Sequence, residues 1–184
     1  MDKRTWPTLH GRSCSLVVLT LADAEAWLTG EDEEQRRWFE IPGPATVTDV
    51  LDAIARWRMD WRTDGSTRHW GIWTGGQLAG GVELRRRPDE RVGISYVVFP
   101  AFRRRGLAVE AIRLATRWAF DHLRIDGVVA VVGEANVASR ATAERSGFTF
   151  DGVAEPWEYD ETGPCVRYLL RPPDVDDADD EPEA

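Results

Sequence analysis

The chain has 184 residues, of which 42% are hydrophobic and 30% are charged, and its formal net charge is −9 at pH 7. This length is enough for a buried core and favours a single domain, which we place in residues 1–173. No apolar run approaches the ~20 residues that cross a bilayer, and the polar start lacks the apolar core of a signal peptide, so we expect a cytoplasmic protein with no membrane partner.

The negative charge is concentrated at the end of the chain. Residues 174–184 hold seven acids and no base, which leaves −2 on the rest, and we expect this acidic tail to be disordered. An arginine cluster on a nearly neutral body suits a small polyanion better than a nucleic acid. The two cysteines, Cys14 and Cys165, show no Cys-x-x-Cys spacing and no nearby histidine pair, so we expect no disulfide framework and no metal.

The first elements are a strand and a helix. Residues 1–12 are predicted to be an untethered lead-in, and residues 15–19 a strand. Thr20 has an acid, Asp23, at the distance of a capping box, which predicts that a helix begins there.

A second helix follows a polar stretch that contains Trp38. Its predicted start is Thr46 or Thr48, and it runs through Trp57 and Trp61. We expect all three tryptophans to fill the core rather than to line a pocket, because helical spacing explains the last two.

Two strands are predicted next, at residues 68–74 and 77–86, joined by the tight turn Gly75-Gly76. Inside the second strand, Gly80-Gly81 indicates either a bulge or a close approach of a ligand. With the strand that follows, these runs predict an antiparallel meander.

The central stretch, residues 92–120, is predicted to be a strand, a basic loop and a long helix. Ile94, Tyr96 and Val98 alternate in a run rich in β-branched residues, and Pro100 ends the strand because it cannot donate to a ladder. From Leu107 onward, apolar residues recur at steps of three and four for roughly four turns.

The loop between that strand and helix has the features of an anion site. The first turn of a helix carries unpaired N–H groups and the positive end of the helix dipole. Gly106 permits close approach to the backbone, while Arg103, Arg104 and Arg105 offer planar donor forks. From the loop alone, phosphate binding and a solvated arginine loop remain equally open.

The last third continues the sheet. Residues 127–133 form the apolar run of a strand buried on both faces, parallel to the central strand. Asn136 is predicted to cap a short helix that runs to Arg145, and residues 148–151 and 165–170 are predicted to pair as a final hairpin.

Two motifs in this order resemble one family. The run Arg103–Ala108 fits Arg/Gln-x-x-Gly-x-Gly/Ala and resembles the acetyl-coenzyme A loop of the GNAT superfamily of N-acetyltransferases. It fits neither a Walker A loop nor a dinucleotide fingerprint. Further on, Glu134-x-Asn136-x-x-Ser139 with Gly147-Phe148 behind it resembles the ribosomal-protein-alanine N-acetyltransferase branch. The match covers about residues 81–150.

This resemblance implies a fold and a set of cofactor contacts. The fold is α/β (α+β), with a mixed, mostly antiparallel sheet of about six or seven strands, helices on its flanks and a parallel strand pair around the central helix. Acetyl-coenzyme A is the implied co-substrate: loop amides hold its pyrophosphate, and the central strand and the Asn136 helix hold its pantetheine. The implied contacts are Tyr96, Val98, Arg103, Arg104, Arg105, Gly106, Leu107, Ala108, Asn136 and Ser139.

The resemblance also implies catalytic residues. Many family members carry a tyrosine seven residues after the asparagine as the acid for the leaving thiolate, where this chain has Ala143. Ser139 is the substitute donor to sulfur, with a plain bond to its own helix as the alternative. As base we expect Glu158, with Glu83 second and a solvated carboxylate as the alternative for each.

We therefore expect direct acetyl transfer to a primary amine, either a protein N-terminus or a small amine of aminoglycoside or polyamine type. A coenzyme A-binding module without turnover is the alternative that Ala143 supports. A nucleic-acid binder using residues 85–87 and the arginine loop is disfavoured by overall acidity. The chain does not distinguish a monomer from a homodimer.

Overall fold

The computed structural model describes residues 6–158 and 163–173, so the predicted disorder of the acidic tail lies outside the described residues. The strands are β1 (Leu9–His10), β2 (Ser15–Val17), β3 (Thr67–Thr74), β4 (Gln77–Arg86), β5 (Val92–Val98), β6 (Val128–Gly133), β7 (Thr149–Val153) and β8 (Cys165–Leu170). The helices are α1 (Ala24–Gly30), α2 (Glu33–Trp38), α3 (Val47–Thr63), α4 (Leu107–His122) and α5 (Val137–Arg145), with 3-10 turns η1 (Leu21–Asp23), η2 (Pro100–Phe102) and η3 (Pro156–Glu158).

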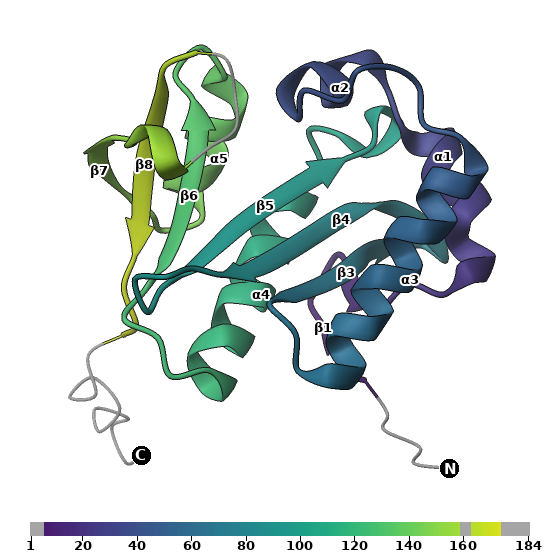
Figure 1. Cartoon of the computed structure of the whole chain (residues 1–184), viewed down its shortest axis with the longest axis horizontal. Helices are drawn as coiled ribbons and strands as arrows, with labels where there is room; N and C mark the ends of the chain where they lie inside the picture. Colours follow the sequence, from purple (N-terminus) through teal and green to yellow (C-terminus); the bar gives the residue numbers. More distant parts are fainter. Residues whose placement is uncertain (1–5, 159–162, 174–184) are drawn as a thin grey trace, which may run out of the picture.

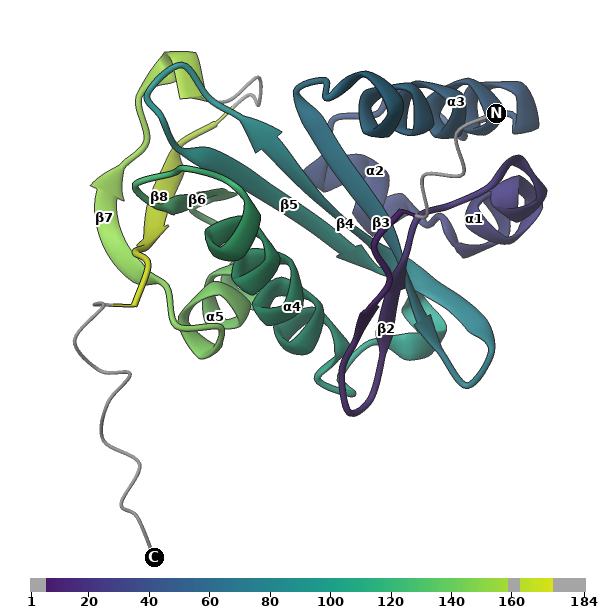
Figure 2. The ribbon, with the colours of Figure 1, turned by 90° about the horizontal axis from the view of Figure 1, so that it is seen from below.

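These strands form one sheet in the order β1-β2-β3-β4-β5-β6-β8-β7, in which only β5 and β6 are parallel. The predicted mixed, mostly antiparallel sheet is confirmed, but it has eight strands rather than six or seven. On one face of the sheet lie α4 and α5, and on the opposite face lies α3 with α1 beside it (Figure 2). The chain is therefore a three-layer structure built around the central strand.

The extra strand comes from the segment that we predicted to be untethered. In β1, Leu9 pairs with Leu16 of β2. Just before it, the carbonyl of Pro7 accepts a hydrogen bond from the Trp70 indole at 3.2 Å, and the guanidinium of Arg58 lies 4.3 Å from the Trp6 ring centre. The prediction of a free lead-in is wrong for residues 6–12, because Trp70 and Arg58 lie more than fifty residues from the residues that they hold.

Helix starts follow the predicted capping signals. Thr20 and Asp23 form a capping box at the start of η1, which leads into α1, and Thr46, rather than Thr48, forms one with Asp49 before α3. The polar stretch between these helices contains a helix that we did not predict, α2, whose N-cap Asp32 accepts a hydrogen bond from the Gln35 amide at 2.9 Å.

Two of the three tryptophans are partly buried and pack against the core, in line with the prediction. The Trp57 ring stacks on His69 with ring centres 3.6 Å apart, and Trp61 meets Trp70 edge-on at 4.9 Å. Trp38 is the exception, because it lies on α2 and lines the cleft described below. The expectation that Trp38 fills the core is therefore wrong.

The first glycine of the pair in β4, Gly80, lies beside a bulge. Ile72 of β3 pairs with Gly80 and the next residue, Trp73, pairs with Leu78, so one residue of β4 is extra. Gly80 has φ 151°, and a Cβ built there would lie 2.1 Å from the carbonyl oxygen of Val97 in β5. Glycine is required here by the neighbouring strand rather than by a ligand.

The parallel pair at the centre of the sheet is short. Only Val92 with Val128, and Gly93 with Val129, are paired between β5 and β6. Beyond these pairs the two strands separate, and Figure 1 shows the opening between β5 on one side and β6, β8 and α5 on the other. This divergence positions the candidate site.

Candidate active site

A cleft with a volume of about 1320 Å³ lies where β5 and β6 diverge. Its walls come from β5, β6, the loop before α4, the first turn of α4, and α5, with α2 closing one end. Every residue that we predicted to contact the cofactor lines it: Tyr96, Val98, Arg103, Arg104, Arg105, Gly106, Leu107, Ala108, Asn136 and Ser139.

The loop before α4 presents backbone amides to the cleft. Gly106 is the N-cap of α4 with φ 77° in the left-handed region, and Arg104 also has a positive φ of 62°. A Cβ at Gly106 would meet nothing within 4 Å, so glycine serves the backbone conformation here. The first helical bond runs from the Glu110 amide to Gly106, so the amides of Leu107 and Ala108 precede the helical ladder. This turn is suited to an anion.

The three arginines of the loop have different surroundings. Arg103 donates from Nη1 to Glu34 at 2.7 Å and from Nη2 to Asp32 at 2.9 Å, while its Nε donates to the carbonyl of Val98 at 3.0 Å. Partial burial would raise the pKa of Asp32, but the hydrogen bonds it accepts from Arg103 and from the Gln35 amide lower it below the usual 3.8. Arg103 is thus bound to α2.

The other two arginines point elsewhere. Arg105 donates to the carbonyl of Ala101 at 2.8 Å and lies over the Phe102 ring at 5.5 Å. Arg104 is exposed and makes no hydrogen bond or ion pair with the residues that the structure describes. Of the three guanidinium groups, that of Arg104 is the one without a partner in this part of the chain.

Ser139 and Tyr96 form a pair of hydroxyl groups in the cleft. Their oxygens lie 2.8 Å apart, and the Tyr96 hydroxyl also lies 3.0 Å from the Ser139 carbonyl. Burial raises the pKa of Tyr96 to about 12. Asn136 accepts a hydrogen bond from the Ser139 amide at 3.0 Å, which fixes the start of α5 as predicted. From the sequence we predicted a role for the Tyr96 backbone alone. The hydroxyl group of a tyrosine within an alternating strand could also have indicated a polar role for its side chain.

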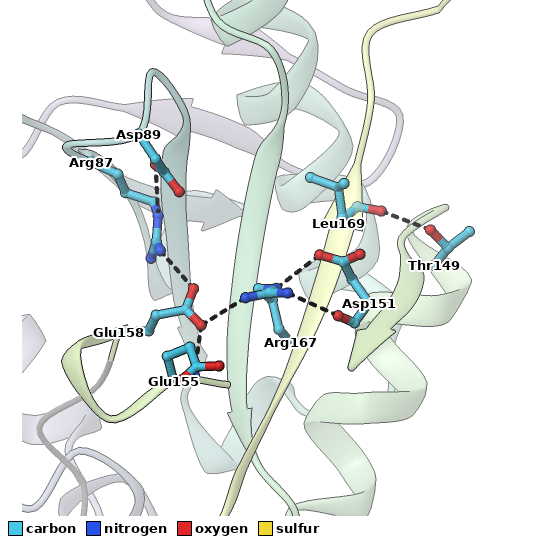
Figure 3. A network of polar contacts seen from close by, with 8 residues as sticks. All are labelled: Arg87, Asp89, Thr149, Asp151, Glu155, Glu158, Arg167 and Leu169. Carbon is cyan, nitrogen blue, oxygen red and sulfur yellow. Dashed lines mark hydrogen bonds and ion pairs between the residues drawn. The ribbon is translucent and has the colours of Figure 1, made fainter. Parts of the chain in front are cut away.

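Glu158, the first candidate for the base, lies outside this cleft in an ion-pair network (Figure 3). Its side chain is 1% exposed, and both oxygens are occupied. Arg87 donates to Oε1 at 2.7 Å, whereas Arg167 and the Glu155 amide donate to Oε2 at 2.9 and 2.8 Å. Arg87 belongs to the β4–β5 turn and Arg167 to β8, so Glu158 bridges the two sides of the divergence.

Glu83, the second candidate, also lies outside the lining. Its side chain is 12% exposed and accepts a hydrogen bond from Arg85 at 2.7 Å. Among the described residues, the carboxylates that do line the cleft are Glu34, bound to Arg103, and Glu110, which accepts from the amides of Arg12 and Ser13. The structure thus brings together the predicted cofactor contacts and Ser139, but neither predicted base.

Neither cysteine lines the cleft, although Cys14 contacts Glu110 of the lining. Cys14 and Cys165 are buried and do not form a disulfide, and burial, followed by the Glu110 charge, raises the pKa of Cys14 to about 12. Within residues 6–158 and 163–173, no cluster of three or more potential metal-binding side chains was found. No helix in the same ranges has the length and apolar character to span a bilayer.

Comparison with known proteins gives consistent matches. The family model described as the acetyltransferase (GNAT) domain matches residues 15–149. The probable N-acetyltransferase YjcK of Bacillus subtilis strain 168 is 29% identical over 157 residues, covering 79% of this chain and 86% of that protein.

Solved structures share the fold. RimL, a ribosomal L7/L12 alpha-N-protein acetyltransferase in complex with coenzyme A, superposes with a TM-score of 0.79 at 14% identity, covering 90% of this chain and 98% of RimL. The microcin C7 self-immunity acetyltransferase MccE, in complex with acetyl-CoA and AMP, superposes with a TM-score of 0.75 at 21% identity, covering 88% of this chain and 93% of MccE.

Proposed function

Because the chain belongs to the GNAT acetyltransferase family and is an acetyl-coenzyme A-dependent N-acetyltransferase, we propose that it acetylates the N-terminal amine of a protein or peptide by direct transfer. The likeness to RimL, an alpha-N-protein acetyltransferase, supports this acceptor. The likeness to MccE supports a small-molecule amine as the second candidate.

One observation carries the proposal: a turn of free amides meets an unpaired strand edge. The Gly106 turn presents the first-turn amides of α4, and β5 pairs with no strand on the β6 side beyond Gly93 within the described ranges. A pyrophosphate is suited to the amides and a pantetheine amide to the strand edge at Tyr96 and Val98. The residues present therefore fit coenzyme A.

When bound, acetyl-coenzyme A supplies the acetyl thioester, and the chain supplies the groups around it. We propose that an N–H group of the Tyr96–Val98 edge polarises the thioester carbonyl. The Ser139 hydroxyl would donate to the sulfur while it accepts the hydrogen bond of the Tyr96 hydroxyl, whose oxygen lies 2.8 Å away. Neither hydroxyl needs to ionise for this role, because a neutral donor is sufficient.

Glu158 and Glu83 remain predictions, from the resemblance, for the base that removes the amine proton. Both carboxylates are bound to arginines and lie outside the cleft, which favours another route for this proton. We propose that the amine loses its proton to water. A Glu158→Gln variant should then keep the acidic limb of the wild-type pH profile of kcat/KM. Loss of that limb would restore Glu158 as the base.

Binding and turnover test the function separately. Coenzyme A at about one hundred times its Kd should stabilise the fold by about 2.7 kcal/mol, measurable as a thermal shift. Release of free thiol from acetyl-coenzyme A is then followed with peptides of different N-terminal residues, with spermidine and with an aminoglycoside. Turnover with the peptides is expected. Faster turnover with the small amines would favour the second candidate, and binding without any turnover would indicate a non-catalytic module.

Ser139→Ala tests the chemistry within the cleft. We expect turnover to fall by about tenfold with little change in coenzyme A affinity, because the lost group donates to the leaving sulfur. Ser146→Ala is the control, since Ser146 ends the same helix outside the cleft and bonds to Thr142. Unchanged turnover in the Ser139 variant would remove Ser139 from the mechanism.

A further inference from the structure

Arg103 differs from the neighbouring Arg104 and Arg105 in that its guanidinium forms ion pairs with two carboxylates of the described residues. We propose that Arg103 is a positioning residue that locks α2 to the cofactor loop, so that occupancy of the loop is transmitted to the wall of the cleft where the acceptor lies. This inference rests on the proposed function. It replaces the expectation that the Arg103 side chain binds phosphate.

The geometry of the guanidinium supports this role. Its Nε donates to Val98 at the end of β5, and its two terminal nitrogens reach the carboxylates of Asp32 and Glu34 at 2.7 to 2.9 Å. Three directions of the planar fork are therefore used inside the protein. A phosphate would have to displace two carboxylates to reach the same group.

The lock acts on the first turn of α2. Asp32 is the N-cap of this helix, and the same Oδ1 atom that Arg103 reaches also accepts the hydrogen bond from the Gln35 amide. A helix of six residues has little stability of its own, because nucleation is costly relative to its few hydrogen bonds. Its position therefore depends on contacts such as these.

Helix α2 provides one wall of the cleft. Gln35, Trp38 and Phe39 all line it, and Phe39 remains 45% exposed. The Gln35 side chain is buried, and its Oε1 has no hydrogen-bond partner among the described residues. A shift of α2 would change both this apolar surface and the unpaired carbonyl. The wall is where an amine-bearing acceptor would gain contacts.

The adjacent Arg104 gives a matched control, because Arg104→Ala removes the same charge from the same loop without removing an ion pair to described residues. Amide hydrogen exchange of peptides spanning residues 31–40 is measured with and without coenzyme A. In the wild type we expect coenzyme A to slow this exchange. In Arg103→Ala the segment should exchange faster and no longer respond to coenzyme A, while the Kd for coenzyme A changes less than threefold.

In Arg104→Ala the pattern should be the reverse, with wild-type exchange in α2 and a coenzyme A Kd raised several-fold. An Arg103→Ala/Asp32→Ala double variant should accelerate exchange by less than the sum of the two single effects, because both single variants already lack the Arg103–Asp32 contact. Arg103→Lys should restore the slow exchange of the wild type only in part, since an ammonium cannot span both carboxylates.

The proposal is overturned if Arg103→Ala weakens coenzyme A as much as Arg104→Ala does while α2 exchanges as in the wild type. That result would make Arg103 a phosphate ligand. If the wild type binds no coenzyme A, the proposed function fails, whereas fast exchange of α2 in ligand-free Arg103→Ala would still establish the lock itself.

Discussion

Two regions of the molecule are built by different means. At the cofactor end of the cleft, the left-handed turn at Gly106 and the free edge of β5 present backbone groups, which most side-chain substitutions leave in place. In the second region, ion pairs hold short segments: Arg103 binds α2 at the cleft wall, and Glu158, outside the cleft, binds η3 to Arg87 and Arg167 (Figure 3). The cofactor end should therefore tolerate sequence change, while the segments of the second region depend on a few charged side chains.

The largest loss of stability is expected when Glu158 is removed. Glu158→Ala leaves Arg87 and Arg167, whose side chains are 11% and 23% exposed, without their shared carboxylate. Loss of one partner of a buried ion pair costs about 3–5 kcal/mol, and the partial exposure of both arginines favours the lower value. Denaturant unfolding measures the change in stability.

Asp89→Ala is the control for that experiment. Asp89 accepts from the same Arg87 at 3.3 Å, but its side chain is 33% exposed, so its loss should cost less than about 1 kcal/mol. Equal losses of stability in the two variants would contradict the view that Glu158 is the centre of the bridge.

The backbone end is tested at Gly106. Gly106→Ala introduces no clash, so its cost is the strain of a Cβ at φ 77°, about 1–2 kcal/mol. We expect this strain to be relieved by a shift of the turn that re-aims its amides, and calorimetry should find coenzyme A affinity reduced by about tenfold.

Gly76→Ala is a matched control, because Gly76 has the same φ of 77° and the same open space in the β3–β4 turn, outside the cleft. It should lose similar stability but no affinity for coenzyme A. Equal affinity in the Gly106 and Gly76 variants would mean that the amides of the α4 turn do not bind the cofactor.

Lowering the pH should reduce stability through His69 and through Asp32 in two different pH ranges. Burial lowers the pKa of His69 to about 3 from its usual 6.5, so the unfolded chain binds a proton that the folded chain does not. Stability should fall as the pH decreases from 6.5 towards 3, by up to about 1.4 kcal/mol per pH unit. Asp32 behaves differently: its lowered pKa keeps it ionised, so its contribution is lost only below about pH 3.8.

The measurement is denaturant unfolding at pH 7, 6 and 5 for the wild type and for His69→Phe, which keeps a ring to stack on Trp57. The variant should have the smaller pH slope. The same slope in both proteins would show that His69 does not contribute to acid sensitivity.

The same division explains what could be predicted from the sequence. The strand, loop and helix of the cofactor end are specified by local signals, namely alternation up to Val98, a proline, and a glycine before a helical period. The α2 helix was missed because Arg103, which holds it, lies about seventy residues away. The environment of Glu158 was likewise invisible, since Arg87 is 71 residues distant. A pattern in the sequence gives local geometry, whereas these partners are brought together only by the sheet.

The shortness of the pairing between β5 and β6 gives the Glu158 ion pairs a second role. Strands β6, β8 and β7 are joined to the rest of the sheet by two residue pairs alone among the described residues, Val92 with Val128 and Gly93 with Val129. Glu158 adds a side-chain connection across the same divergence, because it binds Arg87 on one side and Arg167 on the other.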